Sequence, residues 1–291
     1  MMMTKRTIEA CAKINLTLDV YGTRADGYHA LRSVVLPVSL ADTIVLEPAD
    51  EFSSDTGYDD DLCLRAALVL ANSQWGSAAP GAYQKYSIHI QKRIPVGGGL
   101  GGGSADAAAT LVQLNELWKL GKSRAELAEI GAQVGSDVPS LVLGGAVLME
   151  GRGEKVTPIA TAISTLHLIL VNPGVHSSTK EVYAACAARE KDAPSPTDAM
   201  IAALQTGDLR RIAAAVSNDL QAPAVKLHPE IADALVSLRT AGALGVTMTG
   251  SGSCVFGFAP TAEASGRIAA ELSAKGLCAF ALQGHFAARE K

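Results

Sequence analysis

The chain has 291 residues, of which 48% are hydrophobic and 19% are charged, and its 25 Lys and Arg against 29 Asp and Glu give a net charge of −4. This composition supplies enough apolar side chains for a buried core, which excludes a disordered or acidic-tail protein. A weakly acidic chain with 4% aromatic residues also lacks the basic field and the stacking platforms that nucleic-acid binding uses. At roughly 100–200 residues per domain, the length predicts two domains or one large one.

No targeting or membrane signal is recognisable in the sequence. Charged residues interrupt the first twenty positions, unlike a secretory signal, and no apolar run approaches the roughly 18 residues of a membrane span. The cysteines are odd in number, far apart and without a C-x-x-C pair, which disfavours a disulfide framework and a zinc site: they are Cys11, Cys63, Cys186, Cys254 and Cys278. These features predict a reduced, cytoplasmic protein without a membrane or nucleic-acid partner.

The first quarter of the chain and the segment after it show strand-like and helical patterns. β-compatible runs and period-two alternation predict strands, and helical spacing of apolar residues predicts a helix. The expected strands are 8–20, 29–40, 43–46 and 86–91, the expected helix is 62–72, and a polar loop is expected over 50–61.

Two helices are expected after a glycine-rich stretch. Ser104 is the expected N-cap of the first, whose apolar residues recur at helical spacing from Ala107 to Trp118. The second is expected to begin after Ser123, because Ser123 and Glu126 form a capping-box pattern. It should end near residue 135.

The rest of the chain continues to mix both kinds of element. The expected strands are 141–149, 166–171, 246–249, 254–258 and 279–282, and the expected helices are 197–204, 208–216, 230–241 and 262–275. Because strands and helices do not alternate as strict βαβ units, the pattern favours an α+β fold of two lobes. We expect an N-terminal domain over residues 1–160 and a C-terminal domain over residues 161–291.

Six of the seven residues from Gly97 to Gly103 are glycine. A backbone without Cβ atoms can approach a ligand closely, and the N–H groups and dipole of the helix that follows attract anions. Phosphate is the natural ligand, and Lys92 and Arg93 just before the loop add positive charge. A flexible linker or packing turn is the alternative, but the well-patterned helix favours a phosphate site.

The loop does not match the Walker A pattern, because no Lys-Ser/Thr pair follows the glycines. Gly97, Gly99 and Gly102 formally match G-x-G-x-x-G. A dinucleotide site would need a second strand ending in an acid about 20 residues later, where this chain has another helical pattern. The nucleotide triphosphate site of a kinase fits better.

Asp137 and Lys13 are two further candidates for chemistry. Asp137 lies between an apolar helix and an apolar strand, and Lys13 lies in a strand-like run. Each also has an ordinary structural explanation: a helix cap for Asp137 and a solvent-facing side chain for Lys13. The residues alone leave both explanations open.

Five motifs occur together in an order that resembles a known family. They are Ala12-Lys13-Ile14-Asn15-Leu16, Asp26-Gly27-Tyr28-His29, the run from Pro95 to Ala108, Gly135-Ser136-Asp137-Val138-Pro139 and Gly250-Ser251-Gly252-Ser253-Cys254. The chain is similar to the family of 4-diphosphocytidyl-2-C-methyl-D-erythritol kinases in the galactokinase–homoserine kinase–mevalonate kinase–phosphomevalonate kinase (GHMP) superfamily. The two glycine loops are shared by the superfamily, whereas the first two motifs are specific to this family.

The resemblance implies a fold and a reaction. The N-terminal lobe would resemble ribosomal protein S5 domain 2 and the C-terminal lobe would be ferredoxin-like, with ATP and substrate in the cleft between them. The γ-phosphoryl group of ATP would pass to the 2-hydroxyl of 4-diphosphocytidyl-2-C-methyl-D-erythritol, a step of non-mevalonate isoprenoid precursor biosynthesis. The expected cofactors are ATP and Mg²⁺, and the expected oligomeric state is a monomer or a homodimer.

The resemblance also implies roles for the matching residues. Asp137 would be the general base, and Lys13 would keep it ionised and neutralise the γ-phosphoryl group. Ser104 would contact Mg²⁺ directly or through water, and Tyr28, His29 and Tyr183 would hold the cytosine. The ATP-binding residues would be Lys92, Pro95, Val96, Gly97, Gly98, Gly99, Leu100, Gly101, Gly102, Gly103 and Ser104, and the substrate-binding residues Asn15, Tyr28, His29, Tyr183, Gly250, Ser251 and Gly252.

The chain departs from the usual family pattern at three places. Cys11 replaces a proline, Ala105-Asp106 replaces a common Ser-Asn pair, and Asp61 stands where an asparagine near the adenine is often found. Another small-alcohol kinase of the superfamily, of the homoserine or mevalonate type, is the main alternative. A non-catalytic nucleotide- or sugar-phosphate-binding module and a dinucleotide oxidoreductase are further ones, and Tyr28-His29 argues for a cytidine-containing substrate.

Overall fold

A computed structural model describes residues 5–24, 27–57, 60–73, 83–189 and 194–285; Asp26 of the second motif lies outside them. Two compact units make up the chain. Unit 1 consists of Met1–Ala12, Leu40–Ile94 and Gly101–Leu143, and unit 2 of Lys13–Ser39, Pro95–Leu100 and Gly144–Lys291. The units therefore interleave along the sequence, and a single boundary near residue 160 stays a prediction.

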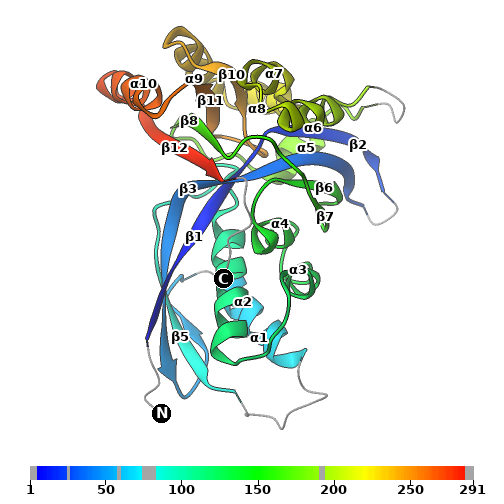
Figure 1. Ribbon diagram of the computed structural model, residues 1–291, viewed down its shortest axis with the longest axis vertical. Coiled ribbons are helices and arrows are strands. Elements are labelled where there is room, and N and C mark those ends of the chain that lie inside the picture. The colour runs from blue at the N-terminus through cyan, green and yellow to red at the C-terminus, as the bar shows by residue number, and fades with distance from the viewer. Residues whose placement is uncertain (1–4, 25–26, 58–59, 74–82, 190–193, 286–291) are drawn as a thin grey trace. The chain divides into compact units, whose positions relative to one another are not determined.

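The elements are shown in Figure 1. The strands are β1 (Arg6–Asn15), β2 (Thr17–Thr23), β3 (His29–Ala49), β4 (Ser53–Ser54), β5 (Lys85–Gln91), β6 (Val147–Gly151), β7 (Lys155–Pro158), β8 (Thr165–Asn172), β9 (Ser217–Asn218), β10 (Leu244–Met248), β11 (Val255–Ala259) and β12 (Cys278–His285). The helices are α1 (Leu62–Asn72), α2 (Gly102–Leu117), α3 (Arg124–Gly131), α4 (Val138–Leu143), α5 (Thr179–Ala184), α6 (Pro196–Thr206), α7 (Leu209–Ala215), α8 (Gln221–Leu227), α9 (Glu230–Thr240) and α10 (Ala262–Ala274).

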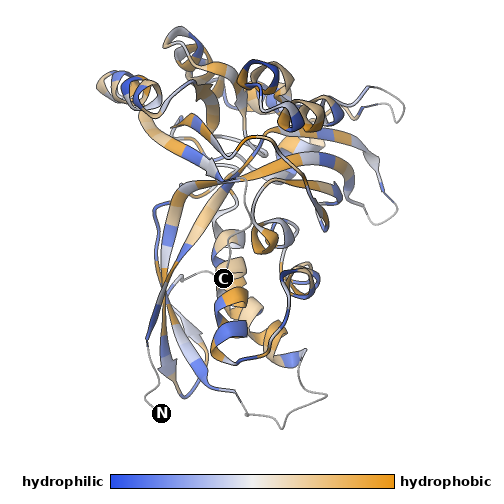
Figure 2. Ribbon diagram, in the orientation of Figure 1, coloured by the Kyte–Doolittle hydropathy of each residue, from blue (hydrophilic) through white to orange (hydrophobic). Residues whose placement is uncertain are grey.

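Unit 1 combines strands with the four helices α1–α4. β5 pairs antiparallel with the second half of β3, from Thr43↔Gln91 to Ala49↔Lys85. The helices pack on one another through apolar residues, and Figure 2 shows these orange residues on α1 and α2. Leu70, Leu111 and Leu114 are fully buried there. The apolar face of α2 therefore packs against the other helices, which holds this helix in place after the glycine loop.

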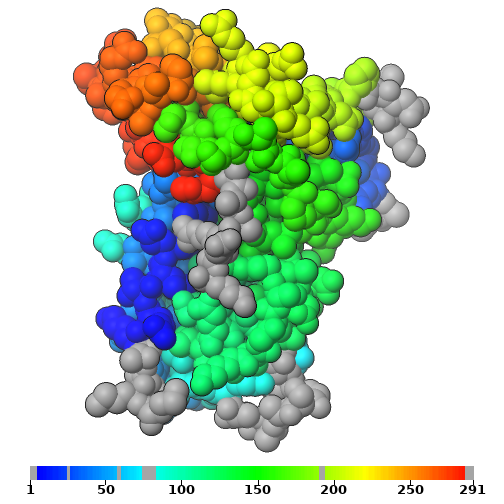
Figure 3. All heavy atoms as spheres, in the orientation of Figure 1, coloured from blue at the N-terminus to red at the C-terminus, as the bar shows by residue number. Residues whose placement is uncertain are grey.

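Unit 2 contains the antiparallel strands β10, β11, β8 and β12, in that order. Phe256 and Phe258 of β11 are completely buried, and their rings meet edge to face at 5.7 Å. Helices α9 and α10 pack on these strands. In Figure 3 the part of the chain coloured from yellow to orange, which contains α6–α10, lies on the visible face of this unit. The hairpin β6–β7 pairs with the first part of β3, with Gly151 opposite Leu31.

Several local predictions are confirmed. α1 has the expected bounds, and α3 begins with the predicted capping box, in which Ser123 and Glu126 cap each other. Two predicted strands, 29–40 and 43–46, form the single long strand β3, whereas the predicted strand 8–20 is two strands, β1 and β2. The break between the predicted strands, at residues 41–42, is therefore absent from β3, which is continuous over His29–Ala49.

Two local predictions are wrong. Ser104 is not an N-cap, because α2 begins at Gly102 with Gly101 as its N-cap, and Ser104 lies in the first turn. The first part of the predicted strand 141–149 is helix α4, and the strand there is only β6. An apolar run of this length does not distinguish a buried helix from a buried strand. None of the helices in the described ranges is long and apolar enough to cross a membrane.

Candidate functional site

Lys13 is a buried cation on β1, only 3% exposed. Its Nζ donates hydrogen bonds to Oδ1 of Asn15 at 2.7 Å and to the carbonyl oxygen of Gly99 at 3.2 Å. Its backbone N–H donates to the carbonyl of Leu100 at 3.0 Å. The solvent-facing explanation for Lys13 is therefore wrong: the ammonium lies on the backbone of the glycine loop.

Asn15 shares a face of β1 with Lys13, because alternate residues of a strand point to the same side. It is also buried, and its Nδ2 donates to Oγ of Ser33 at 2.8 Å. Its backbone N–H donates to Oγ1 of Thr249 at 3.0 Å. These bonds hold the Asn15 amide so that Oδ1 faces the Lys13 ammonium.

The two glycine loops lie against each other in unit 2. The backbone N–H of Cys254 donates to the carbonyl of Gly98 at 3.1 Å. Gly99 has a φ of +75°, and a Cβ there would overlap the carbonyl oxygen of Thr249. A Cβ on Gly250 would lie 2.8 Å from the Gly99 carbonyl oxygen. Glycine is therefore required at both positions, because backbone meets backbone there.

A third segment, 175–179, joins this pair of loops, and sequence reasoning missed it. Oγ of Ser177 donates to the carbonyl of Ser251 at 2.7 Å, and the hydroxyls of Thr179 and Ser251 share a hydrogen bond of 2.8 Å. Oγ of Ser253 donates to the carbonyl of Val175 at 2.5 Å. The loop 250–252 of the substrate-binding prediction is thus fastened to the segment that leads into α5.

The aromatic residues predicted to hold a base also lie in unit 2. The rings of His29 and Tyr183 are 5.5 Å apart, with an angle of 33° between them. Nδ1 of His29 lies 3.3 Å from the carbonyl oxygen of Tyr21. Tyr28 is 54% exposed, and the guanidinium of Arg152 lies 5.4 Å above its ring. Sequence reasoning missed Arg152; the turn between β6 and β7 brings it beside the start of β3.

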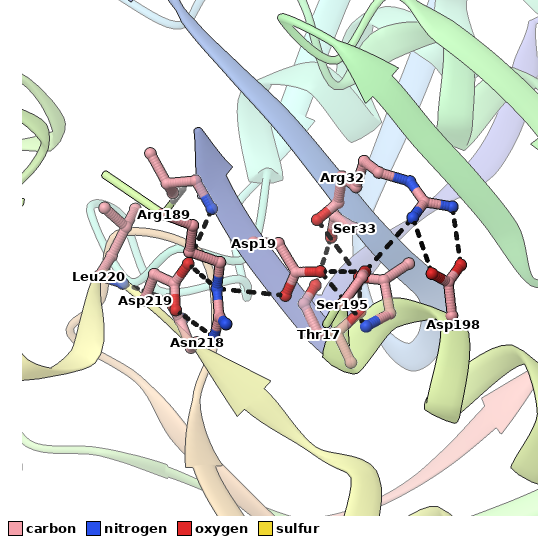
Figure 4. A network of polar contacts seen from close by, with 12 residues as sticks. Thr17, Asp19, Arg32, Ser33, Arg189, Ser195, Asp198, Asn218, Asp219 and Leu220 are labelled. Atoms are coloured by element: carbon pink, nitrogen blue, oxygen red, sulfur yellow. Dashed lines mark hydrogen bonds and ion pairs between the residues drawn. The ribbon is translucent and has the colours of Figure 1, made fainter. Parts of the chain in front are cut away.

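A buried polar network anchors β2 beside these aromatic residues (Figure 4). Asp19 is fully buried and accepts from Oγ of Ser195 at 2.6 Å. Arg189 forms two hydrogen bonds with Asp219, at 2.5 and 2.7 Å, and Asp219 also accepts from the backbone N–H of Val20 at 2.9 Å. Asp219 raises the pKa of Arg189 by hydrogen bonding. The network fixes the strand that carries Tyr21.

Unit 1 holds the remaining predicted residues, among them Ser104 and Asp137. Ser104 is half-buried in the first turn of α2, and within the described chain its hydroxyl has no hydrogen-bond partner. Asp137 is half-buried and directly precedes α4. Its carbonyl oxygen accepts from Oγ of Ser140 at 2.7 Å and from the N–H of Leu141 at 3.4 Å. Its role as a base, and its partnership with Lys13, stay predictions.

Lys92 bridges two buried carboxylates in unit 1, those of Asp42 and Asp106. Sequence reasoning missed Asp42. Nζ of Lys92 lies 2.5 Å from Oδ2 of Asp42 and 2.8 Å from Oδ2 of Asp106. Oδ1 of Asp42 accepts two backbone N–H groups, from Arg93 and Ile94. The carboxylates of Asp42 and Asp106 therefore largely neutralise the positive charge of Lys92. The predicted role of Lys92 in ATP binding does not depend on an unpaired ammonium.

The electrostatics of this cluster follow from its burial. Burial raises the pKa of Asp106 to about 7, against the opposing effect of the Lys92 ammonium. Burial lowers the pKa of Lys92, but its hydrogen bonds to Asp106 and Asp42 outweigh that effect and raise it. Oδ1 of Asp106 is buried without a hydrogen-bond partner in the described structure. A single ammonium thus serves two carboxylates, and Asp106 is the less fully compensated one.

Asp61 has a clear local role. Its Oδ1 accepts from the backbone N–H groups of Cys63 and Leu64, at 2.7 and 3.0 Å, so it is the N-cap of α1. Its Oδ2 accepts from Oγ1 of Thr56 at 2.5 Å. Both carboxylate oxygens are thus engaged within unit 1, and nothing in these contacts needs a nucleotide.

The arrangement in unit 2 is suited to anionic ligands. The buried ammonium of Lys13 on β1 lies against the backbone of the first glycine loop, and the second glycine loop is bonded to the hydroxyls of Ser177 and Thr179. The segment that carries these hydroxyls continues into α5, whose Tyr183 lies beside His29 of β3. Such groups stabilise phosphoryl oxygens as charge develops on them. No group of three or more His, Cys, Asp or Glu residues in the described part of the chain is arranged to hold a metal ion.

Two family models match parts of the chain. Residues 61–145 match the family described as GHMP kinases N terminal domain, and residues 200–277 match GHMP kinases C terminal. A 4-diphosphocytidyl-2-C-methyl-D-erythritol kinase from Symbiobacterium thermophilum is 42% identical over 269 residues, which is 90% of this chain and 93% of the relative. One from Thermobifida fusca is 40% identical over 97% of this chain and 96% of its own length.

Solved structures agree with these matches. The crystal structure of a 4-(cytidine 5'-diphospho)-2C-methyl-D-erythritol kinase has a TM-score of 0.79 and 34% identity, and the match covers 96% of this chain and 99% of that one. A homoserine kinase from Cytophaga hutchinsonii has a TM-score of 0.73 at 18% identity, over 98% of this chain and 96% of that one. The second likeness shows the shared fold alone. The expected α+β fold of the GHMP superfamily is confirmed.

Proposed function

The chain belongs to the family of 4-diphosphocytidyl-2-C-methyl-D-erythritol kinases within the GHMP kinases, and we propose that it transfers the γ-phosphoryl group of ATP to the 2-hydroxyl of 4-diphosphocytidyl-2-C-methyl-D-erythritol. This reaction is a step in the synthesis of isoprenoid precursors. The observation that carries the proposal is the buried Lys13 ammonium, held on the carbonyl of Gly99 in the glycine loop.

Phosphoryl transfer to an alcohol needs charge neutralisation and a proton acceptor. Lys13 is the proposed cation beside the transferred phosphoryl group, and Asp137 is the proposed acceptor of the hydroxyl proton. An ordinary aspartate is a weak base for an alcohol, so the ammonium has to stabilise the oxygen as its negative charge develops. The loops that hold Lys13 fix its position before the substrate arrives.

Mg²⁺ is the proposed metal, because it commonly binds through substrate phosphates, waters and only one or two protein oxygens. Ser104 supplies a hydroxyl without a protein partner in the described structure, in the first turn of the helix after the glycine loop. We assign Ser104 as the protein ligand, and the metal would neutralise phosphate charge there.

The cytidine end of the substrate is assigned to the aromatic residues of unit 2. Tyr28 offers an exposed ring, and His29 and Tyr183 face each other at 5.5 Å. Aromatic rings at such positions bind a base by stacking. A cytoplasmic location and a monomer or homodimer are also part of the proposal, and no disulfide joins any of the five cysteines.

The deciding experiment is an ADP-release assay with the full chain, ATP and Mg²⁺. Release is expected with 4-diphosphocytidyl-2-C-methyl-D-erythritol, but not with homoserine or mevalonate, and CMP should compete with the substrate. Release with homoserine or mevalonate alone would instead identify another small-alcohol kinase. No release with any alcohol, despite ADP binding, would indicate a non-catalytic binding protein.

A further inference from the structure

The imidazole of His176 lies directly against the first glycine loop. Gly97 has a φ of +71°, and a Cβ on it would overlap Nδ1 of His176 and lie 2.6 Å from Cε1. The Nδ1–Cε1 edge of the ring thus occupies the space where another residue at position 97 would carry its side chain. His176 is far from the loop in sequence, so its presence there is a product of the fold.

The backbone around His176 is held in place on both sides. Val175 accepts a hydrogen bond from Ser253, and Ser177 donates one to the carbonyl of Ser251 at 2.7 Å. Thr179 shares a further hydrogen bond with Ser251. The imidazole is therefore presented from a segment fastened to the second glycine loop, and not from a loosely attached one.

The ring is exposed, and no hydrogen bond or ion pair to it occurs among the described residues. An imidazole always has at least one N–H donor, and gains a second one with a positive charge when it is protonated. Residues 95–105 contain no charged side chain. The Pro95–Leu100 part of the loop, which belongs to unit 2 like His176, offers a bound phosphate only backbone N–H groups, and His176 adds a basic side chain beside Gly97.

We propose that His176 is a further phosphate-binding residue of this kinase, which donates a hydrogen bond to a phosphate oxygen at Gly97; the proposal rests on the function proposed above. Two phosphate groups share this chemistry. One belongs to ATP, which the glycine loop would hold. The other is the diphosphate of the alcohol substrate, because the segment of His176 continues into α5, which carries Tyr183, where the cytosine is assigned.

The test compares nucleosides with their diphosphates in a His176→Ala variant of the full chain. Dissociation constants are measured by calorimetry for adenosine and ADP, and for cytidine and CDP. Losing one hydrogen bond should raise the dissociation constant of the diphosphate in one pair by about fivefold. The dissociation constant of the matching nucleoside should stay unchanged. An effect on the adenine pair assigns the contact to ATP, and one on the cytidine pair assigns it to the alcohol substrate.

Two control variants and the use of a binding assay make the result interpretable. His228→Gln removes an imidazole at the end of α8, outside the loops of the site, and should change neither pair. His176→Gln keeps a donor and should recover part of the lost affinity. Binding is measured without turnover, so failure of the proposed reaction in the wild type does not decide the outcome for His176.

Two results would overturn the proposal. If both diphosphates bind His176→Ala as tightly as the wild type, His176 makes no phosphate contact. If nucleoside and diphosphate weaken to the same extent, the imidazole only supports the packing of the glycine loop. Each result contradicts a direct contact with phosphate.

Discussion

The ammonium of Lys13 and the carbonyl oxygen of Gly99 are 3.2 Å apart, although 86 positions separate them in the sequence. A Cβ on Gly99 would overlap the carbonyl oxygen of Thr249, so two segments distant in the sequence meet this loop. This convergence places a fixed positive charge on backbone that can approach a phosphate closely.

Replacing that charge should abolish most of the activity. In Lys13→Met, kcat should fall by about 10²–10³, the loss expected when one fixed electrostatic group is removed. The ADP-release assay measures kcat, and circular dichroism checks that the variant is folded. Lys5→Met is the matched control, because Lys5 forms an exposed ion pair with Glu47, and such pairs contribute little. Wild-type kcat in Lys13→Met would remove Lys13 from the mechanism.

The proposed base can be tested separately from nucleotide binding. Asp137→Asn keeps the shape of the side chain but cannot accept the proton, so kcat should fall by about 10²–10⁴. ADP should still bind with nearly wild-type affinity. Asp60→Asn, at an exposed ion pair with Arg65, should behave as the wild type. Retained turnover in Asp137→Asn would reject the base assignment.

Replacing the aromatic ring of Tyr183 should raise KM for the cytidine-containing alcohol and leave KM for ATP unchanged. In Tyr183→Ala, KM for the cytidine-containing alcohol should rise by about tenfold, because stacking contributes roughly 1–3 kcal/mol per base. KM for ATP should stay the same, and Tyr183→Phe should be close to wild type because it keeps the ring. Equal changes in both KM values would show that Tyr183 has no specific role at the base.

Alanine substitutions at different glycines of the loop should change the free energy of unfolding by different amounts. Gly99→Ala combines a positive φ with overlap on the Thr249 carbonyl, so the free energy of unfolding should fall by about 2–4 kcal/mol. Gly103 lies in α2, where the nearest neighbour to a Cβ is Leu62 Cδ1 at 3.5 Å. Gly103→Ala should leave stability unchanged or raise it by about 0.5 kcal/mol. Urea unfolding of both variants measures the difference; similar losses would contradict the geometry.

The buried cluster around Lys92 predicts a dependence of stability on pH. The raised pKa of Asp106, about 7, means that the folded state binds a proton that the unfolded state has released at about pH 4. The contribution of this carboxyl to the free energy of unfolding should therefore decrease as the pH rises from about 4 to 7. Asp106→Asn has no such titration.

Urea unfolding at pH 5 and pH 8 tests this prediction. Between the two pH values, the wild type should lose roughly 1–3 kcal/mol of stability relative to Asp106→Asn. Subtracting the variant removes the contribution of the other titrating groups. A difference that stays constant with pH, or that favours the wild type at pH 8, would show that Lys92 keeps Asp106 fully ionised.

Local sequence signals determined a substantial part of this protein. The capping box of α3, the bounds of α1, the glycine loops and the family motifs around Lys13 and Tyr28 are all readable from neighbouring residues. Propensity, capping and glycine chemistry act over a few positions, so they appear in the sequence directly.

Only the tertiary structure decided how those pieces are used. It placed Asp42 on Lys92, His176 on Gly97, Arg152 over Tyr28 and Thr249 against Gly99, and it divided the chain into interleaved units. It also made residues 138–143 a helix where an apolar run had favoured a strand. These outcomes depend on which distant segments pack together, and packing energy over such separations leaves no periodic pattern along the chain.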